Sequence, residues 1–142
     1  MPGEAIFGPF FGMLLLTFVV WVYLYVRRLA FIKANNIDAQ QLTTPVRGEQ
    51  IIPEEVSYPS YNFRNLFELP VVFYALCLYL YVTHGVDEVY VVAAWAFFGL
   101  RLLHSLIHST SNIVMFRFVA YMASALTLWF MVLRAAIDFF VL

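Results

Sequence analysis

Four long apolar runs, separated by polar segments, account for most of the chain. Each has roughly the 20 residues that an α-helix needs to cross a bilayer. The runs cover about residues 6–28, 62–83, 89–109 and 113–140. We predict an all-α integral membrane protein in which residues 1–142 form a single domain, a bundle of four transmembrane helices.

The first run is typical of a membrane span rather than of a cleaved signal peptide. The residues before it, MPGEA, contain an acid and no basic cluster, and the run is longer than the apolar core of a signal peptide. After it, residues 35–60 contain prolines, a glycine and several acids, which predicts an exposed loop. A polar link at residues 109–112 reverses the chain before the last run, with Asn112 as the expected helix cap.

The charges that flank the runs predict how the helices cross the membrane. Basic residues gather after the first run and near the link between the third and fourth, and acids gather at the other end. The basic set is Arg27, Arg28, Lys33, Arg47 and Arg117, and the acidic set is Glu4, Asp87, Glu88 and Asp138. By the positive-inside tendency, both termini are expected to be non-cytoplasmic and the loop at 35–60 cytoplasmic. The membrane would be the inner or plasma membrane in a bacterium and the endoplasmic reticulum in a eukaryote.

The composition agrees with a membrane protein and excludes some functions. Hydrophobic residues make up 63% of the chain and charged residues 12%, against roughly 25% charged in ordinary soluble domains. A net charge of −1 without a basic arm argues against nucleic acid as a partner. Cys77, the only cysteine, lies within an apolar run and is expected to be a small buried hydrophobic residue.

The third run carries an arginine and two histidines within a segment that its apolar composition predicts to lie in the bilayer. Arg101, His104, Ser105 and His108 fall on one face of a helix, within an arc of about 100°. A central arginine in a membrane helix costs roughly 2.5–3.5 kcal/mol on insertion scales. We therefore expect this face to line the protein interior or a wet cavity, and we treat it as a candidate functional site.

Two more polar stripes are predicted at the same end of the membrane. The second run places Tyr61, Arg64, Asn65 and Glu68 on one face, and the fourth places Arg117, Tyr121 and Ser124 on another. Because consecutive spans are antiparallel, we expect all the intramembrane charges at the cytoplasmic end, where Arg64 and Glu68 can pair at a spacing of four residues. The arginines outnumber the single carboxylate there, which predicts an anion-binding site. For Arg27 and Arg28 the alternative is that they anchor the helix to lipid phosphates.

The spacing of His104 and His108 would also let two helical histidines share a metal ion or a haem. No second pair of this kind and no cysteine ligand accompanies them, and the neighbouring arginines would repel a cation. We therefore expect no metal and interpret the histidines as hydrogen-bonding or anion-binding groups.

Three motifs resemble those of the membrane-associated proteins in eicosanoid and glutathione metabolism (MAPEG). This superfamily includes the microsomal glutathione transferases and the prostaglandin E and leukotriene synthases. The motifs are Arg-Asn-x-x-Glu in the second run (Arg64, Asn65, Glu68), Arg-x-x-His in the third (Arg101, His104) and Arg-x-x-x-Tyr in the fourth (Arg117, Tyr121). The resemblance covers nearly the whole chain.

The resemblance implies a homotrimer of four-helix protomers with glutathione as cosubstrate, bound between subunits near the cytoplasmic face. It assigns glutathione binding to Arg64, Asn65, Glu68 and His104, together with a basic residue that is either Arg27 or Arg28. It also places Arg117 and Tyr121 nearest the sulfur. Arg101 and His108, on the same predicted face as His104, join the candidate binding residues.

The chain also departs from the family pattern. Tyr61 stands where some members have an arginine, and His108 where some have a tyrosine. Phe118 stands where the prostaglandin synthases have a serine, which argues against prostaglandin E synthase chemistry.

We predict a membrane glutathione transferase or peroxidase that acts on lipophilic electrophiles arriving through the bilayer. One alternative is a non-catalytic subunit that stabilises a larger membrane complex or binds an anionic lipid in the same cavity. Another is a bis-histidine metal or haem binder. The identity of the second substrate and of the thiol stays open at this point.

Overall fold

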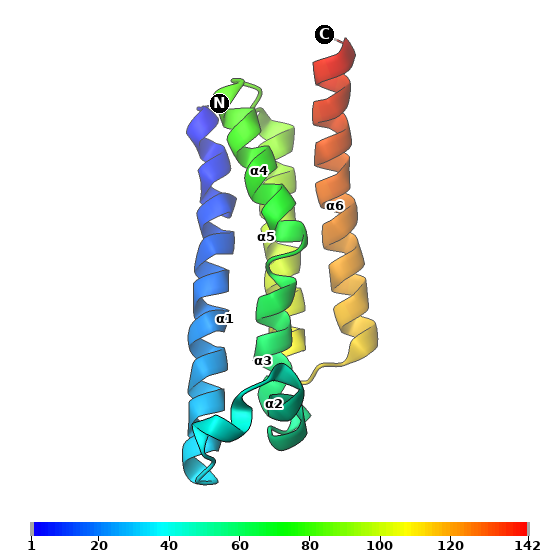
Figure 1. Cartoon of the computed structure of the whole chain (residues 1–142). Helices are drawn as coiled ribbons and strands as arrows, with labels where there is room; N and C mark the ends of the chain where they lie inside the picture. Colours follow the sequence, from blue (N-terminus) through cyan, green and yellow to red (C-terminus); the bar gives the residue numbers. More distant parts are fainter. Residues whose placement is uncertain (1, 142) are drawn as a thin grey trace.

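The computed structural model describes residues 2–141 and consists of helices joined by short links (Figure 1). The long helices are α1 (Phe7–Ala34), α4 (Leu69–Val82), α5 (Glu88–Ser109) and α6 (Val114–Val141). The shorter ones are η1 (Gly3–Ile6), η2 (Ala39–Leu42), α2 (Pro45–Ile51) and α3 (Glu54–Asn65). Four helical stretches are long and apolar enough to span a membrane: Gly3–Ala34, Glu54–Val82, Glu88–Ser109 and Val114–Val141. The prediction of an all-α protein with four spans is confirmed.

The second span is not one continuous helix, as the sequence analysis assumed. Helix α3 ends at Asn65 and α4 begins at Leu69, and Glu68 between them has non-helical backbone angles (φ −96°, ψ −105°). Pro70 explains the break, because a helix running through it would lose a backbone hydrogen bond and press the proline ring against the Leu66 carbonyl. The predicted helical stripe therefore ends at Asn65, and Glu68 leaves it.

The predicted loop at residues 35–60 is also largely helical. It contains η2, α2 and the first half of α3. The side chain of Thr44 accepts a hydrogen bond from the Arg47 N–H, and Pro45 occupies the first turn of α2. Pro53 directly precedes α3. Prolines are well suited to helix starts, where their missing N–H has no partner to lose, so here they begin helices instead of excluding them.

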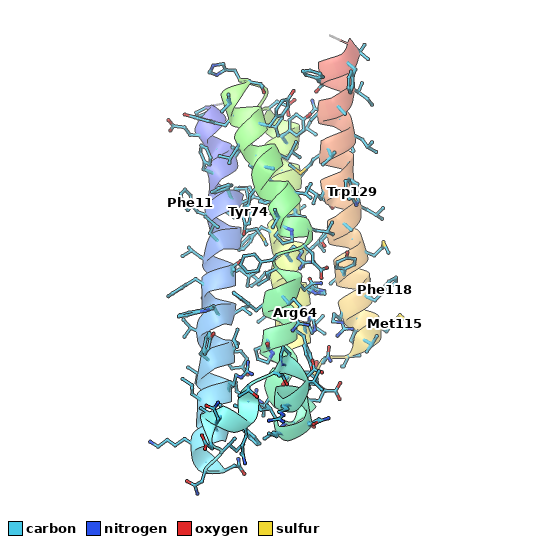
Figure 2. The ribbon with its side chains drawn as sticks, in the orientation of Figure 1. Phe11, Arg64, Tyr74, Met115, Phe118 and Trp129 are labelled. Atoms are coloured by element: carbon cyan, nitrogen blue, oxygen red, sulfur yellow. The ribbon has the colours of Figure 1, made fainter. Side chains whose placement is uncertain are left out.

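Helix α5 lies at the centre of the bundle and packs against α1, α3 and α6, whereas α6 packs mainly on α5 (Figure 1). The apolar core includes Phe73 of α4 stacked on Phe97 of α5, with ring centroids 4.6 Å apart. Large apolar side chains such as Phe11 and Trp129 are exposed on the outside of the bundle (Figure 2). An exposed apolar surface of this extent is suited to lipid or to a neighbouring subunit.

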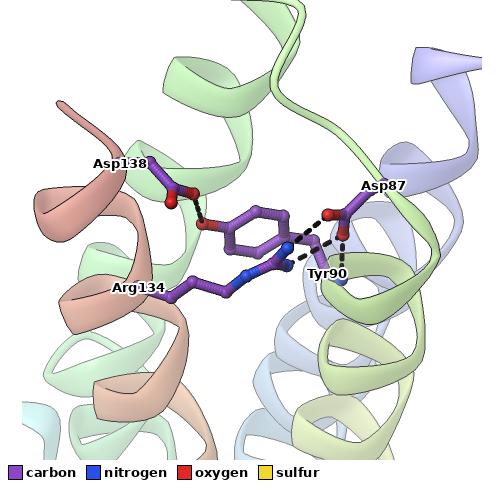
Figure 3. Close-up of polar contacts among 4 residues, drawn as sticks. All are labelled: Asp87, Tyr90, Arg134 and Asp138. Carbon is purple, nitrogen blue, oxygen red and sulfur yellow. Dashed lines mark hydrogen bonds and ion pairs between the residues drawn. The ribbon is translucent and has the colours of Figure 1, made fainter. Parts of the chain in front are cut away.

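Both chain ends lie at one end of the bundle, which we call the termini end; η2, α2 and the α5–α6 turn lie at the other, the loop end (Figure 1). A charged cluster occupies the termini end (Figure 3). Arg134 of α6 donates to both carboxylate oxygens of Asp87, at 2.9 Å for Nη1, and its guanidinium lies 4.3 Å from the Tyr90 ring centroid. The Tyr90 hydroxyl donates to Asp138 at 3.2 Å. The sequence analysis expected all charges within the membrane-spanning segments to lie at the loop end. That expectation is wrong, because Arg134 of α6 lies at the termini end, where it pairs with Asp87.

Candidate functional site

The polar face of α5 points into the protein, as its helical spacing predicts. Arg101 is 0% exposed, and His104, Ser105 and His108 are also buried. The opposite face, with Leu102, Leu103 and Leu106, is exposed. The predicted inward orientation of this stripe is confirmed.

Two histidines of α5, four residues of α6 and Asn65 line a cavity of about 250 Å³ near the loop end. We call it the histidine cavity. It lies between α5, the end of α3 and the first turns of α6, and its lining residues are Asn65, His104, His108, Val114, Arg117, Phe118 and Tyr121. Residues predicted from three separate sequence motifs thus meet at one place.

His104 has a defined orientation in this cavity. Its Nδ1 lies 3.1 Å from the carbonyl oxygen of Arg117. Because a carbonyl can only accept, Nδ1 carries the proton, and Nε2 of the neutral ring is then an acceptor. Within the described chain, His104 Nε2 and His108 Nδ1 are buried and have no hydrogen-bond partner. Two imidazole nitrogens of residues that line the cavity therefore lack a hydrogen-bond partner in the described chain.

Arg101 lies beside the cavity with part of its hydrogen-bonding capacity unused. One of its terminal nitrogens, Nη2, donates to Asn65 Oδ1, and its ζ carbon lies 5.7 Å from the centroid of the Tyr121 ring. Its Nε and Nη1 are buried without a partner among residues 2–141. The ion pair between Arg134 and Asp87 is the only one found over those residues, so no carboxylate pairs directly with Arg101. Asn65, which accepts from Arg101, donates to Glu68. A buried cation in this state favours an anionic ligand.

Arg117 and Tyr121 form the α6 wall of the cavity. Nη1 of Arg117 donates to the side-chain oxygen of Asn112 at 2.5 Å. The centroids of the Tyr121 and His104 rings are 5.8 Å apart. The expectation that Asn112 caps α6 is wrong. Asn112 has a positive φ of 49°, a conformation that asparagine tolerates at turns, and its side chain orients Arg117 instead of binding a backbone N–H.

The residues of the Arg-Asn-x-x-Glu motif do not converge in one protomer. Asn65 reaches the histidine cavity, whereas Arg64 and Glu68 are exposed. Glu68 accepts a hydrogen bond of 3.3 Å from Asn65, and no ion pair joins it to Arg64. The predicted pair fails because its spacing of four residues holds only within a continuous helix, which ends at Asn65.

A second cavity of about 270 Å³ lies at the loop end, beneath η2 and α2. We call it the loop cavity. Arg28 and Arg64 line it, together with Glu49, hydroxyl groups of residues 43, 44, 57, 60 and 61, and apolar side chains. Arg27 points elsewhere and donates to the Tyr23 hydroxyl at 2.9 Å and to the Glu55 carbonyl. Of the two candidate arginines at the end of the first span, Arg28 is therefore the one placed beside Arg64.

Sequence reasoning missed Asn62, which is completely buried between α3 and α5. It exchanges hydrogen bonds with Ser105 and Ser109. Its position four residues before the buried Leu66 could have indicated an inward-facing side chain. In the part of the chain that the structure describes, no three His, Cys, Asp or Glu side chains gather closely enough to hold a metal ion.

These features define a class of protein, a multi-pass helical membrane protein with a cationic cavity near one end of its bundle. The model of the MAPEG family matches residues 6–137, and the chain belongs to the MAPEG family. The resemblance read from its motifs is thereby confirmed, and membership supports a membrane role in glutathione or eicosanoid metabolism in general. No curated protein and no solved structure matches the chain.

Proposed function

We propose that the protein is a membrane glutathione transferase or peroxidase, which uses glutathione to conjugate or reduce lipophilic electrophiles. The observation that carries this proposal is the histidine cavity, which Arg117, Tyr121 and His104 line. The buried Arg101, with two unpartnered donors, lies behind the lining residues Asn65 and Tyr121. A cavity with this excess of positive charge suits a ligand with carboxylates and an ionisable thiol.

Arg117 is the residue proposed to activate the thiol. A free cysteine thiol has a pKa near 8.5, so only a few per cent is thiolate at neutral pH. A fixed guanidinium beside the sulfur favours the anion and increases the population of the nucleophile. Asn112 orients Arg117 before any ligand binds, so the cation needs little rearrangement. Tyr121 would donate a hydrogen bond to the same sulfur.

The complete glutathione site is proposed to form between subunits of a homotrimer. Within one protomer the histidine cavity and the loop cavity share no lining residue, although both carry arginines that the family motifs assign to glutathione. An interface that places the loop cavity of one subunit beside the histidine cavity of the next would bring Arg28 and Arg64 to Arg117. MAPEG membership is compatible with such an oligomer.

The second substrate is proposed to enter from the lipid. Val114 and Phe118, the apolar lining residues of the histidine cavity, are themselves exposed on α6. A lipophilic electrophile could therefore reach the sulfur without crossing water. In this arrangement the loop end faces the cytoplasm and both termini lie on the opposite side, in a bacterial inner membrane or the endoplasmic reticulum.

Calorimetric titration of glutathione into the detergent-solubilised protein tests the proposal, followed by rate measurements with 1-chloro-2,4-dinitrobenzene and with an organic hydroperoxide. We expect saturable binding and turnover above the uncatalysed rate. S-methylglutathione, which has no free thiol, should bind without supporting turnover. Absence of both binding and turnover would refute the proposal.

A non-catalytic role is the second candidate, and the unpartnered donors of Arg101 favour it as much as they favour glutathione. In that case the cavity binds an anionic lipid headgroup, or the protein stabilises a larger membrane complex. Co-purification of a stoichiometric anionic lipid or of a constant set of membrane proteins, without glutathione binding, would support this candidate.

A further inference from the structure

Helices α3 and α5 are joined by a row of side-chain hydrogen bonds, which we call the α3–α5 ladder. Its members are Asn62 and Asn65 on α3 and Arg101, Ser105 and Ser109 on α5. Asn62 Nδ2 donates to Ser109 Oγ at 2.9 Å and to the Ser105 carbonyl at 3.4 Å, and Ser105 Oγ donates to Asn62 Oδ1 at 3.2 Å. Arg101 donates to Asn65 Oδ1 in the same row.

The spacing of the ladder fixes one alignment of the two helices. Its members are three residues apart on α3 and four apart on α5, so they lie on successive turns of facing surfaces. Asn62 is completely buried, and both its amide nitrogen and its oxygen have partners. A shift of α3 along α5 would leave a buried amide without hydrogen bonds, which is unfavourable because the amide then loses its partners without regaining water.

The alignment of helix α3 is not fixed by one continuous helix through its span. The chain is non-helical at Glu68, between α3 and α4, so helical geometry does not carry the rotation of α4 into α3. Helix α3 packs against α1 and α5. Among its side chains, Asn62 makes the buried polar contacts with α5 that depend on alignment.

We propose that Asn62 is a positioning residue for the ligand site, an inference that rests on the proposed function. By aligning α3 on α5, Asn62 places Asn65 Oδ1 against Arg101. That contact occupies one terminal nitrogen of Arg101 and leaves Nε and Nη1 without a hydrogen-bond partner in the described chain, behind the cavity-lining residues Asn65 and Tyr121. Loss of the alignment would turn or release Arg101 and weaken binding of the anionic ligand, although Asn62 does not line the cavity.

Three variants and a control test this role by glutathione calorimetry, each at a temperature well below its own melting point. Asn62→Leu removes the hydrogen bonds at similar volume, Ser109→Ala removes one partner, and Ser109→Thr keeps the hydroxyl. We expect affinity to fall about tenfold in Asn62→Leu, since small misplacements of site groups carry large effects. Affinity should fall less in Ser109→Ala and stay near wild type in Ser109→Thr. The control, Asp87→Asn, lowers stability at the termini end and should leave affinity unchanged.

Unchanged affinity in folded Asn62→Leu, or an equal loss in the control, would overturn the inference. A ligand-free measurement separates this failure from failure of the proposed function. Spin labels on cysteines introduced at the exposed positions Glu55 and Leu106, in a Cys77→Ala background, report the distance between α3 and α5. We expect a narrow distribution that broadens or shifts with Asn62→Leu or Ser109→Ala. If wild type binds no glutathione, the proposed function fails, and an unchanged distance in both variants still refutes the alignment by Asn62.

Discussion

At the scale of single residues, the histidine cavity combines groups whose orientation is already fixed with groups that lack partners. Arg117 is held through its side chain by Asn112 and through its carbonyl by His104. Arg101 and both histidines retain buried nitrogens without a hydrogen-bond partner in the described chain. This combination is expected of a binding site, because a purely structural cluster would satisfy its own donors and acceptors.

The role of Arg117 can be tested by separating binding from thiol ionisation. We expect Arg117→Leu to fold, to oligomerise and to retain appreciable glutathione affinity, while the pKa of the bound thiol rises and turnover at neutral pH falls. Thiolate absorbance near 240 nm, followed over roughly pH 5 to 10 around the free-thiol value, measures the change. Arg117→Lys keeps the positive charge, so the pKa of its bound thiol and its turnover should lie between those of wild type and Arg117→Leu. Coincident titration curves of wild type and Arg117→Leu would show that Arg117 does not stabilise the thiolate and serves only to anchor the helix.

Arg64 and Glu68 discriminate between a site within one protomer and a site between subunits. Both side chains are exposed and unpaired with each other in the described chain. Arg64→Ala and Glu68→Ala should therefore change the free energy of unfolding by only about 0.5 kcal/mol, as expected for surface substitutions. If an intersubunit site forms, each should nevertheless weaken glutathione binding in calorimetry. Normal affinity in both variants would remove these residues from the site.

At the scale of elements, α6 is attached to the bundle by polar contacts near both ends. Near the loop end Arg117 contacts His104 of α5, and near the termini end Arg134 contacts Asp87, the residue that caps α5. Between these contacts α6 packs mainly on α5. The two polar attachments therefore set how α6 lies along α5 and where it closes the histidine cavity.

The ion pair of Asp87 and Arg134 should contribute modestly to stability. Its side chains are 44% and 30% exposed, respectively, and exposed pairs typically contribute about 0.2–1 kcal/mol. We expect a coupling energy of that size from a double-mutant cycle with Asp87→Asn and Arg134→Met, measured by unfolding in detergent. A coupling energy of zero would show that the contact adds nothing to stability.

The same pair predicts a dependence of stability on pH. Hydrogen bonds from Arg134 hold the pKa of the Asp87 carboxyl below its ordinary value of 3.8. Because the folded pKa is the lower one, the stabilisation is fully present above that ordinary value and is lost as the pH falls through the folded pKa. The stability difference between wild type and Asp87→Asn should thus be constant at neutral pH and shrink below about pH 4. A difference that shrinks already at neutral pH would contradict this assignment.

At the scale of the whole molecule, two separate cationic cavities and a broad exposed apolar surface point to a protein that is completed by its neighbours. We expect a trimer in mild detergent, with native mass spectrometry or light scattering as the measurement. Glutathione should stabilise the trimer, because a ligand held between subunits binds only the assembled state. A monomer that binds glutathione with full affinity would contradict an intersubunit site.

The sequence by itself determined the features that depend on one continuous helix. The lengths of the apolar runs predicted four spans, because a bilayer requires about 20 residues of helix. Helical periodicity predicted that Arg101, His104, Ser105 and His108 would share the buried face of α5, and no other helix had to be known. The family motifs named Asn65, Arg117 and Tyr121, which the structure places beside these residues.

Only the tertiary structure decided which residues meet across helices. The break before Pro70 released Glu68 from the stripe that contains Arg64, because helical spacing loses its meaning where the helix ends. The rotation of α1 placed Arg28 rather than Arg27 in the loop cavity. Packing of α3 on α5 buried Asn62, and packing of α6 on α5 brought Arg134 to Asp87. Each of these contacts depends on the relative rotation and height of two helices, which a pattern along one chain segment does not specify.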